Sequence, residues 1–286
     1  MKNVSNDLNQ LTNKVKIALF ILFLILGYSS KEQVFKPDLK AYKLKGKVKS
    51  INVKHYLPEE RNGKITKRKQ IGTLYMLFNE KGNIIESGDE TGKDTYKYDQ
   101  NGYLSELISN RKDAGPFFKK YTYKYDNRGK QIESATYDSL GSMNTENTFQ
   151  YNGEGYVTQW NLLVFDGSLN QKVTYKNDQR GNQVEADYYY NSDGSLSSKT
   201  TFKYDDRGNQ IESNSYNPTG SLLYKSSYKY DDKGNMIEVR YYNPGGNNTK
   251  TTWKYTFDAY NNIVGVVVSV NDKPTQISEI VIEYYK

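Results

Sequence analysis

Carboxylate side chains recur at fixed positions along the chain, and paired carboxylates are the groups from which a glycoside hydrolase is built. Glutamate fills one slot of a repeated motif and aspartate fills another. The slots are occupied by Glu86, Glu133, Glu185, Glu212 and Glu238, and by Asp99, Asp126, Asp178, Asp205 and Asp231. An active site requires one singular arrangement, whereas a residue repeated five times serves the repeated unit. We therefore expect no enzyme activity and no catalytic residue.

The composition limits metal and nucleophile chemistry. The 286 residues contain no cysteine and one histidine, His55, which excludes disulfides, thiolate ligands and sites with several histidines. The aspartate-rich turns lack the ligand spacing of a calcium-binding loop. We expect no metal and no cofactor, and we place His55 on a strand surface.

The 28 tyrosines are the remaining candidates for ligand chemistry. Aromatic rings in a row can stack on sugar faces, while neighbouring Glu, Asn and Gln side chains hydrogen-bond the sugar hydroxyls. The candidate ligand-binding residues are Tyr123, Tyr125, Tyr204, Tyr228, Tyr230 and Trp253. The alternative is that these tyrosines pack across the strands of a sheet.

An internal repeat defines the elements that position these residues. The motif Y-x-Y-D-x-x-G-N-x-I-E is clearest at 123–133, 202–212 and 228–238, and its turn glycines are 26 or 27 residues apart from Gly102 onward. A second glycine series follows the first by 12 or 13 residues, so a turn arrives about every 13 residues. The stretch 205–208 (DDRG) predicts a three-residue hairpin loop with a G1 bulge, its glycine at positive φ.

In the segments between turns, side chains of different type alternate with the two-residue period of a β-strand. The predicted fold is all-β: a repetitive antiparallel β-hairpin meander that forms one long twisted, coiled sheet. Residues 46–56 begin this sheet and 262–285 end it, as two caps. Pairing across the turn predicts Tyr204 opposite Gln210 and Phe202 opposite Glu212.

The sequence predicts a chain of four segments: a signal peptide or N-terminal anchor at 1–29, basic N-terminal strands at 30–70, hairpin repeats at 71–265 and capping strands at 266–286. The apolar run 17–27 follows two lysines and is shorter than the roughly 20 residues of a bilayer-spanning helix. This pattern predicts export with cleavage after Ser29. The alternative is an uncleaved membrane anchor.

Charge is concentrated near the N-terminus. Residues 30–70 carry 13 basic and 4 acidic side chains, and 61–69 (RNGKITKRK) is the densest run. Lysine and arginine clusters neutralise phosphates, but such a run also suits a solvated hairpin tip. Because the repeat region is mildly acidic and the chain is predicted to be exported, we expect no nucleic-acid partner. Membrane contact is expected only through an uncleaved N-terminal segment.

The pairs Tyr125-Asp126, Tyr204-Asp205 and Tyr230-Asp231, each followed by x-x-Gly-Asn or x-x-Gly-Lys, resemble the YD repeat of rearrangement-hotspot-type bacterial proteins. The resemblance covers roughly 70–265. It implies hairpins wound into a spiral sheet and suggests carbohydrate binding. Large members close the sheet into a shell around a toxin, but this chain has too few repeats and no toxin-sized extension, so that role does not carry over.

Two functional hypotheses follow for an exported protein that is periplasmic, cell-surface or secreted. One is a binding module for a glycan or cell-surface polymer, acting through a tyrosine-rich sheet face. The other is a structural scaffold of the cell envelope that binds a protein partner.

Overall fold

The structure is a computed structural model, and it describes residues 37–112, 118–191, 193–246 and 248–286. The predicted signal peptide or anchor at 1–29 lies outside the described residues. These residues divide into two compact units, one of Pro37–Glu90 with Trp253–Lys286 and one of Thr91–Thr252. Within the described ranges, no helix is long and apolar enough to cross a membrane.

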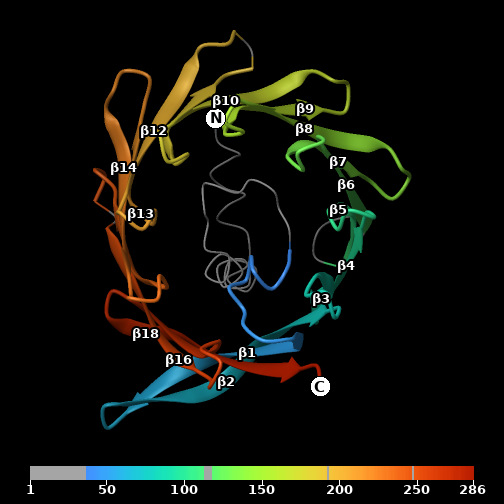
Figure 1. Cartoon of the computed structure of the whole chain (residues 1–286). Helices are drawn as coiled ribbons and strands as arrows, with labels where there is room; N and C mark the ends of the chain where they lie inside the picture. Colours follow the sequence, from blue (N-terminus) through green and yellow to red (C-terminus); the bar gives the residue numbers. More distant parts are fainter. Residues whose placement is uncertain (1–36, 113–117, 192, 247) are drawn as a thin grey trace. The chain divides into compact units, whose positions relative to one another are not determined.

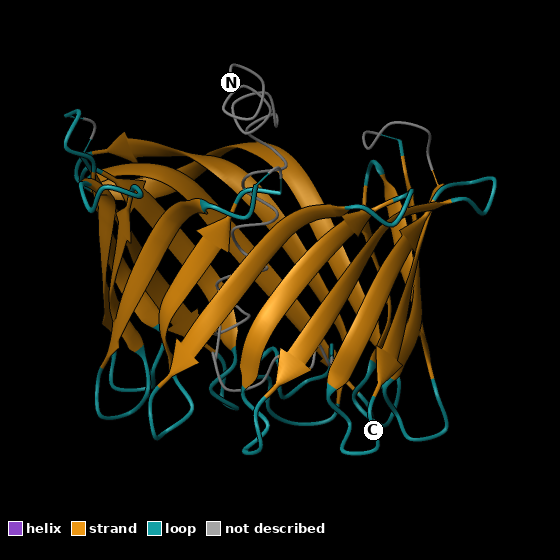
Figure 2. Cartoon of the chain, turned by 90° about the horizontal axis from the view of Figure 1, so that it is seen from above, coloured by secondary structure: helices purple, strands orange, loops and turns teal. Residues whose placement is uncertain are grey.

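The described residues form 18 antiparallel strands joined by short turns (Figures 1 and 2). The first unit holds β1 (Val48–Arg61), β2 (Lys64–Phe78), β3 (Ile84–Asp89), β17 (Ile263–Val270) and β18 (Lys273–Tyr284). The second holds β4 (Gly92–Tyr98), β5 (Leu104–Arg111), β6 (Phe118–Tyr125), β7 (Gln131–Tyr137), β8 (Met143–Tyr151), β9 (Val157–Val164), β10 (Leu169–Asn177), β11 (Gln183–Tyr189), β12 (Leu196–Tyr204), β13 (Gln210–Tyr216), β14 (Leu222–Tyr230) and β15 (Met236–Tyr242). Strand β16 (Thr249–Phe257) contributes residues to both. The predicted all-β antiparallel hairpin meander is confirmed.

The first unit contains the aliphatic core. Its strands pair in the order β17-β18-β1-β2-β3. Alternating apolar residues of β1, Ile51 and Val53, are 1% exposed, and Met76 and Phe78 of β2 are at most 1% exposed. Burying such side chains contributes about 1.5–3 kcal/mol each. Most of the buried aliphatic side chains of the described residues therefore lie where the two ends of the described chain meet.

The pairing of β1 with β18 corrects the prediction of one coiled ribbon with a separate cap at each end. Val48 pairs with Tyr284 at one end of this ladder and Tyr56 pairs with Ile277 at the other. Both strands carry an apolar face, and pairing them satisfies main-chain groups that a terminal strand leaves open. The first and last strands of the meander are therefore neighbours (Figure 1).

The second unit is a sheet with few large buried side chains. Small residues occupy most of its buried positions: Ala135, Ala186, Thr200, Ser213, Ser215 and Ser226. Its stability therefore depends on the hairpins and their turns more than on a thick core.

The predicted turn is confirmed at 205–209. The amide of Gly208 donates to the carbonyl of Asp205 at 3.0 Å, the amide of Asp205 donates to the carbonyl of Asn209 at 2.9 Å, and Gly208 has φ 83°. The predicted pairing of Phe202 with Glu212 is wrong, because a further bulge follows the turn. Tyr204 pairs with Gln210, but Lys203 pairs with Glu212 and Phe202 with Ser213. Glu212 thus lies beside a lysine rather than a ring.

Candidate functional site

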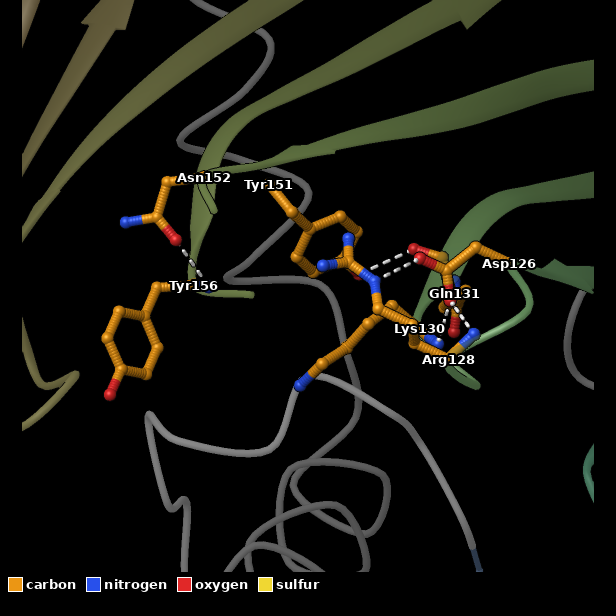
Figure 3. A network of polar contacts seen from close by, with 7 residues as sticks. All are labelled: Asp126, Arg128, Lys130, Gln131, Tyr151, Asn152 and Tyr156. Carbon is orange, nitrogen blue, oxygen red and sulfur yellow. Dashed lines mark hydrogen bonds and ion pairs between the residues drawn. The ribbon is translucent and has the colours of Figure 1, made fainter. Parts of the chain in front are cut away.

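The tyrosine–aspartate pairs lie at one edge of the second unit, where each turn is built by its aspartate. In the turn after β6, the Asp126 carboxylate accepts the amides of Arg128 at 2.9 Å and Lys130 at 2.7 Å, and it forms an ion pair with the Arg128 guanidinium (Figure 3). In the next such turn, Asn152 accepts the amide of Tyr156 at 2.8 Å. The repeated aspartate is therefore a turn-forming residue, as the sequence predicted.

A tyrosine directly before the turn links neighbouring hairpins in four repeats. The Tyr151 hydroxyl donates to the carbonyl of Gln131 at 2.5 Å (Figure 3). The same bond recurs from Tyr125 to Leu104, from Tyr204 to Gln183 and from Tyr230 to Gln210, at 2.8–2.9 Å. In the one repeat that has asparagine at this position, the Asn177 amide donates to the carbonyl of Val157 at 2.9 Å. In these five repeats the slot holds a donor that reaches the preceding hairpin, and tyrosine supplies it in four of them.

The structure distributes the six predicted ligand-binding residues over four strands. Tyr123 and Tyr125 lie on β6, Tyr204 lies on β12, and Tyr228 and Tyr230 lie on β14. Trp253 belongs to the first unit and is 3% exposed. These residues do not form one continuous row, and their role in ligand binding stays a prediction.

The five predicted tyrosines are also partly buried, and the hydroxyls of four of them, Tyr125, Tyr204, Tyr228 and Tyr230, are hydrogen-bonded. The Tyr228 hydroxyl shares a hydrogen bond of 3.1 Å with Ser213. Burial raises the pKa of Tyr230 to about 12 and raises the pKa values of Tyr123 and Tyr125. Burial therefore favours the neutral phenol at these three tyrosines, and Tyr125 and Tyr230 donate from it to a protein carbonyl.

The repeated glutamate forms ion pairs with lysines on adjacent strands. Glu212 contacts Lys203 at 2.9 Å and Lys225 at 2.6 Å, and these contacts lower the pKa of Glu212 to about 2. Comparable contacts join Glu106 to Lys97 and Lys120, Glu185 to Lys176 and Lys199, and Glu238 to Lys229 and Arg240. The interpretation that this glutamate serves the hairpin is confirmed for these copies.

A groove of about 500 Å³ lies between two consecutive turns of the tyrosine–aspartate edge. Tyr228 and Tyr230 line it together with Asp206 and Asp232. The Arg207 guanidinium crosses this seam and donates to the carbonyl of Asp232 at 3.2 Å. Within the described part of the chain, no group of three or more His, Cys, Asp or Glu residues is placed to hold a metal ion.

The opposite edge of the second unit carries a feature that the sequence reasoning missed. Three successive tips on this edge, between β7 and β8, β9 and β10, and β11 and β12, hold Leu140, Phe165 and Tyr190. These side chains are 88%, 74% and 53% exposed. We call them the apolar tips. Their signal in the sequence was a large apolar residue in or beside the turn that ends in the second-series glycine.

The histidine also differs from its prediction. His55 is 5% exposed rather than on a surface, and its Nδ1 lies 3.0 Å from the Ser278 hydroxyl. Among the described residues, its Nε2 has no hydrogen-bond partner. The burial follows from β1 lying between β18 and β2, a pairing that the local sequence did not reveal.

No protein-family model matches the chain, and no curated protein matches it in sequence. The resemblance to the YD-repeat family therefore has no support from a family model. Solved structures do match. A porin-like protein from Bacteroides uniformis ATCC 8492 shares 14% identity with a TM-score of 0.44, over 82% of this chain and 98% of that chain.

Two further matches have lower scores. A porin-like protein from Bacteroides vulgatus ATCC 8482 shares 13% identity with a TM-score of 0.38, over 84% of this chain and 99% of that chain. The structure of TcdB2-TccC3-TEV shares 12% identity with a TM-score of 0.28, over 80% of this chain and 14% of that chain. None of these likenesses assigns an activity to this chain.

Proposed function

We propose that this protein is a non-catalytic scaffold of the cell envelope that binds a protein partner through the apolar tips. Export to the envelope and kinship with YD-repeat proteins are parts of the same proposal. The short apolar run near the N-terminus supports the first, and the recurring tyrosine–aspartate turns support the second.

The apolar tips are the observation that carries the proposal. They lie on every second strand connection, so neighbouring tips are separated by two strand spacings, roughly 10 Å. Single exposed apolar residues are common on proteins, whereas three on successive tips of one edge set that edge apart. At the other edge, the residues that follow three of the turn aspartates, Asn127, Gln179 and Asp206, are exposed and polar. Among these described turns, the edge with the apolar tips is therefore the one suited to an apolar contact.

The repeated polar groups support a scaffold rather than an enzyme. The aspartates build turns, the glutamates pair with lysines, and the tyrosines before the aspartates donate to the preceding hairpin. Side chains used in this way hold neighbouring hairpins together. A rigid sheet of this kind presents its turns at fixed spacing, which is what a contact surface requires.

Glycan binding is the second candidate function. The observation in its favour is the groove in which Tyr228 and Tyr230 lie beside Asp206 and Asp232. An aromatic ring next to carboxylates offers a sugar both a stacking face and hydrogen-bond acceptors. Cell-surface polymers that carry sugars fit this candidate as well as free glycans do.

Site-specific photo-crosslinking in living cells tests the first candidate against the second. A photoreactive amino acid replaces Leu140 or Phe165 in one pair of strains and Asn127 or Gln179 in the matched control pair. We expect a discrete crosslinked protein from the first pair and none from the second. Equal crosslinking from both edges, or none from either, contradicts the scaffold proposal. Glycan-array binding that is lost on Tyr228→Ala supports the second candidate instead.

A further inference from the structure

The first hairpin extends past the sheet as a two-stranded arm. Strand β1 pairs with β18 only as far as Tyr56, and from Leu57 to Arg61 it pairs with β2 alone among the described strands. Residues 61–70 are all exposed. We call residues 57–70 the basic arm, because it carries five basic and two acidic side chains (Figure 1).

Three cations of the basic arm are not neutralised by the protein. Among the described residues, Lys64, Arg68 and Lys69 have no ion pair, whereas Lys67 contacts Glu279 and Arg61 contacts Glu59 at 2.9 Å. The lysines of the repeat are different, since each lysine two residues before a turn aspartate, at 97, 124, 176, 203 and 229, pairs with a glutamate. The lysines at this repeat position are thus neutralised by a glutamate, whereas Lys64 and Lys69 of the arm are not.

Two bulges shape the arm. Pairing shifts between His55 and Tyr56 and again between Leu57 and Pro58. The second shift leaves Arg68 without a partner residue, between Lys67 and Lys69. A bulge interrupts the alternation of side chains and strengthens the local twist. The three consecutive cations 67–69 therefore do not simply alternate between two faces of the ribbon.

We infer that the basic arm is a docking site for an anionic bilayer surface, with lipid phosphate groups as the ligands of Lys64, Arg68 and Lys69. This contact is separate from the apolar tips and from any N-terminal anchor. Clusters of lysine and arginine bind anionic headgroups through charge complementarity. Ile65 is 38% exposed beside Lys64, and Leu57 and Pro58 are partly exposed along the arm. Apolar side chains among cations favour a membrane interface over a soluble polyanion.

Vesicle binding by the full-length protein tests this inference with two triple variants. Lys64→Gln, Arg68→Gln and Lys69→Gln neutralise the arm. Lys124→Gln, Lys176→Gln and Lys203→Gln remove the same charge from the paired lysines, and both variants keep the N-terminal apolar run. At low salt, we expect the arm variant to bind phosphatidylglycerol-containing vesicles about 10- to 100-fold more weakly than the unaltered protein. The control variant should bind within about 2-fold, and binding should weaken as salt rises.

Several outcomes overturn the inference. Equal binding by the arm variant and the unaltered protein does so, as does an equal loss in both variants. Arm-dependent binding to soluble polyphosphate without arm-dependent binding to vesicles assigns the arm to a polymer instead. Zwitterionic vesicles report the contribution of the N-terminal run, which both variants share. Thermal unfolding checks that the exposed substitutions leave the fold intact, since such changes usually shift stability by less than about 0.5 kcal/mol.

Discussion

The hydroxyl of Tyr204 donates a hydrogen bond of 2.8 Å to the main-chain carbonyl of Gln183, the first residue of the return strand in the preceding hairpin. The two residues lie on strands β11 and β12, and the bond ties the turn end of one hairpin to the turn end of the next. Equivalent bonds from Tyr125, Tyr151 and Tyr230 make this a property of the repeat. The tyrosine of the motif is thus a link between repeats.

Replacing this tyrosine with phenylalanine isolates the hydrogen bond. Tyr204→Phe keeps the ring but leaves the Gln183 carbonyl without this donor, and we expect a loss of about 1 kcal/mol in the free energy of unfolding. Tyr190→Phe is the matched control, because Tyr190 is 53% exposed. Denaturant unfolding measures both. Equal stability of the two variants contradicts the linking role.

The turn glycine has a second constraint besides its positive φ. At Gly181, φ is 80° and an added Cβ would meet the ring of Tyr156 from the neighbouring turn. At Gly141, φ is 81° and an added Cβ would have nothing within 4 Å. Gly141→Ala should therefore cost only the strain of the left-handed backbone, about 1–2 kcal/mol. Gly181→Ala should cost at least about 1 kcal/mol more, because the ring must move. If denaturant unfolding shows the same loss of stability in both variants, the contact with the Tyr156 ring does not contribute.

The local chemistry of the hairpins could be read from the sequence. The residue types and spacing of Asp205 and Gly208 predict a turn, and the structure has the predicted hydrogen bonds there. The bulge beside Glu212 was missed because no glycine or proline marks it. One displaced residue was enough to exchange Phe202 for Lys203 as the partner of Glu212.

The non-local relationships could not be read in the same way. Val48 and Tyr284 lie at opposite ends of the described chain, and an alternating apolar strand shows only that it needs a neighbour, not which one. The partner of the Tyr204 hydroxyl is a main-chain carbonyl, which leaves no trace in residue type. In the sequence, a tyrosine that stacks on a ligand therefore cannot be told from one that links hairpins; the distinction requires the positions of the neighbouring hairpins.

Acid should weaken the glutamate–lysine contacts in a defined range of pH. Glu212 has a folded-state pKa of about 2, below its ordinary value of 4.5, because Lys225, Lys203 and Asn214 donate to it. Its contribution to stability is fully present above about pH 4.5 and is lost as pH falls towards about 2. Because the lysines are 68% and 42% exposed, we expect only about 1 kcal/mol.

The matched variants for this prediction are Glu212→Gln and Glu154→Gln, the second at an exposed turn position. The stability difference between the unaltered protein and Glu212→Gln should be present near neutral pH and absent near about pH 2. Glu154→Gln should follow the unaltered protein throughout. A difference that does not change with pH argues against ionisation of Glu212 as its source.

Mild acid should act on the pairing of the first and last strands through His55. Burial lowers the pKa of His55 from its ordinary value of 6.5, while Glu90 opposes that shift. As pH falls below about 6.5, His55 becomes protonated in the unfolded chain but stays neutral in the folded chain. The stability therefore falls until pH reaches the folded-state pKa. Above about pH 6.5 the histidine is neutral in both the folded and the unfolded chain, so it adds no pH dependence to the stability.

The His55→Gln variant removes this titration while keeping a side chain that can hydrogen-bond Ser278. The melting temperature of the unaltered protein should therefore fall more steeply than that of the variant between about pH 7 and about pH 5. The quantity to compare is the slope of melting temperature against pH, because the substitution itself can change stability at every pH. Hydrogen exchange should place the acid-induced opening at β1 and β18, since His55 is paired with Ser278 across that ladder. Parallel melting curves, or opening confined to the repeat hairpins, contradict a role for this buried histidine.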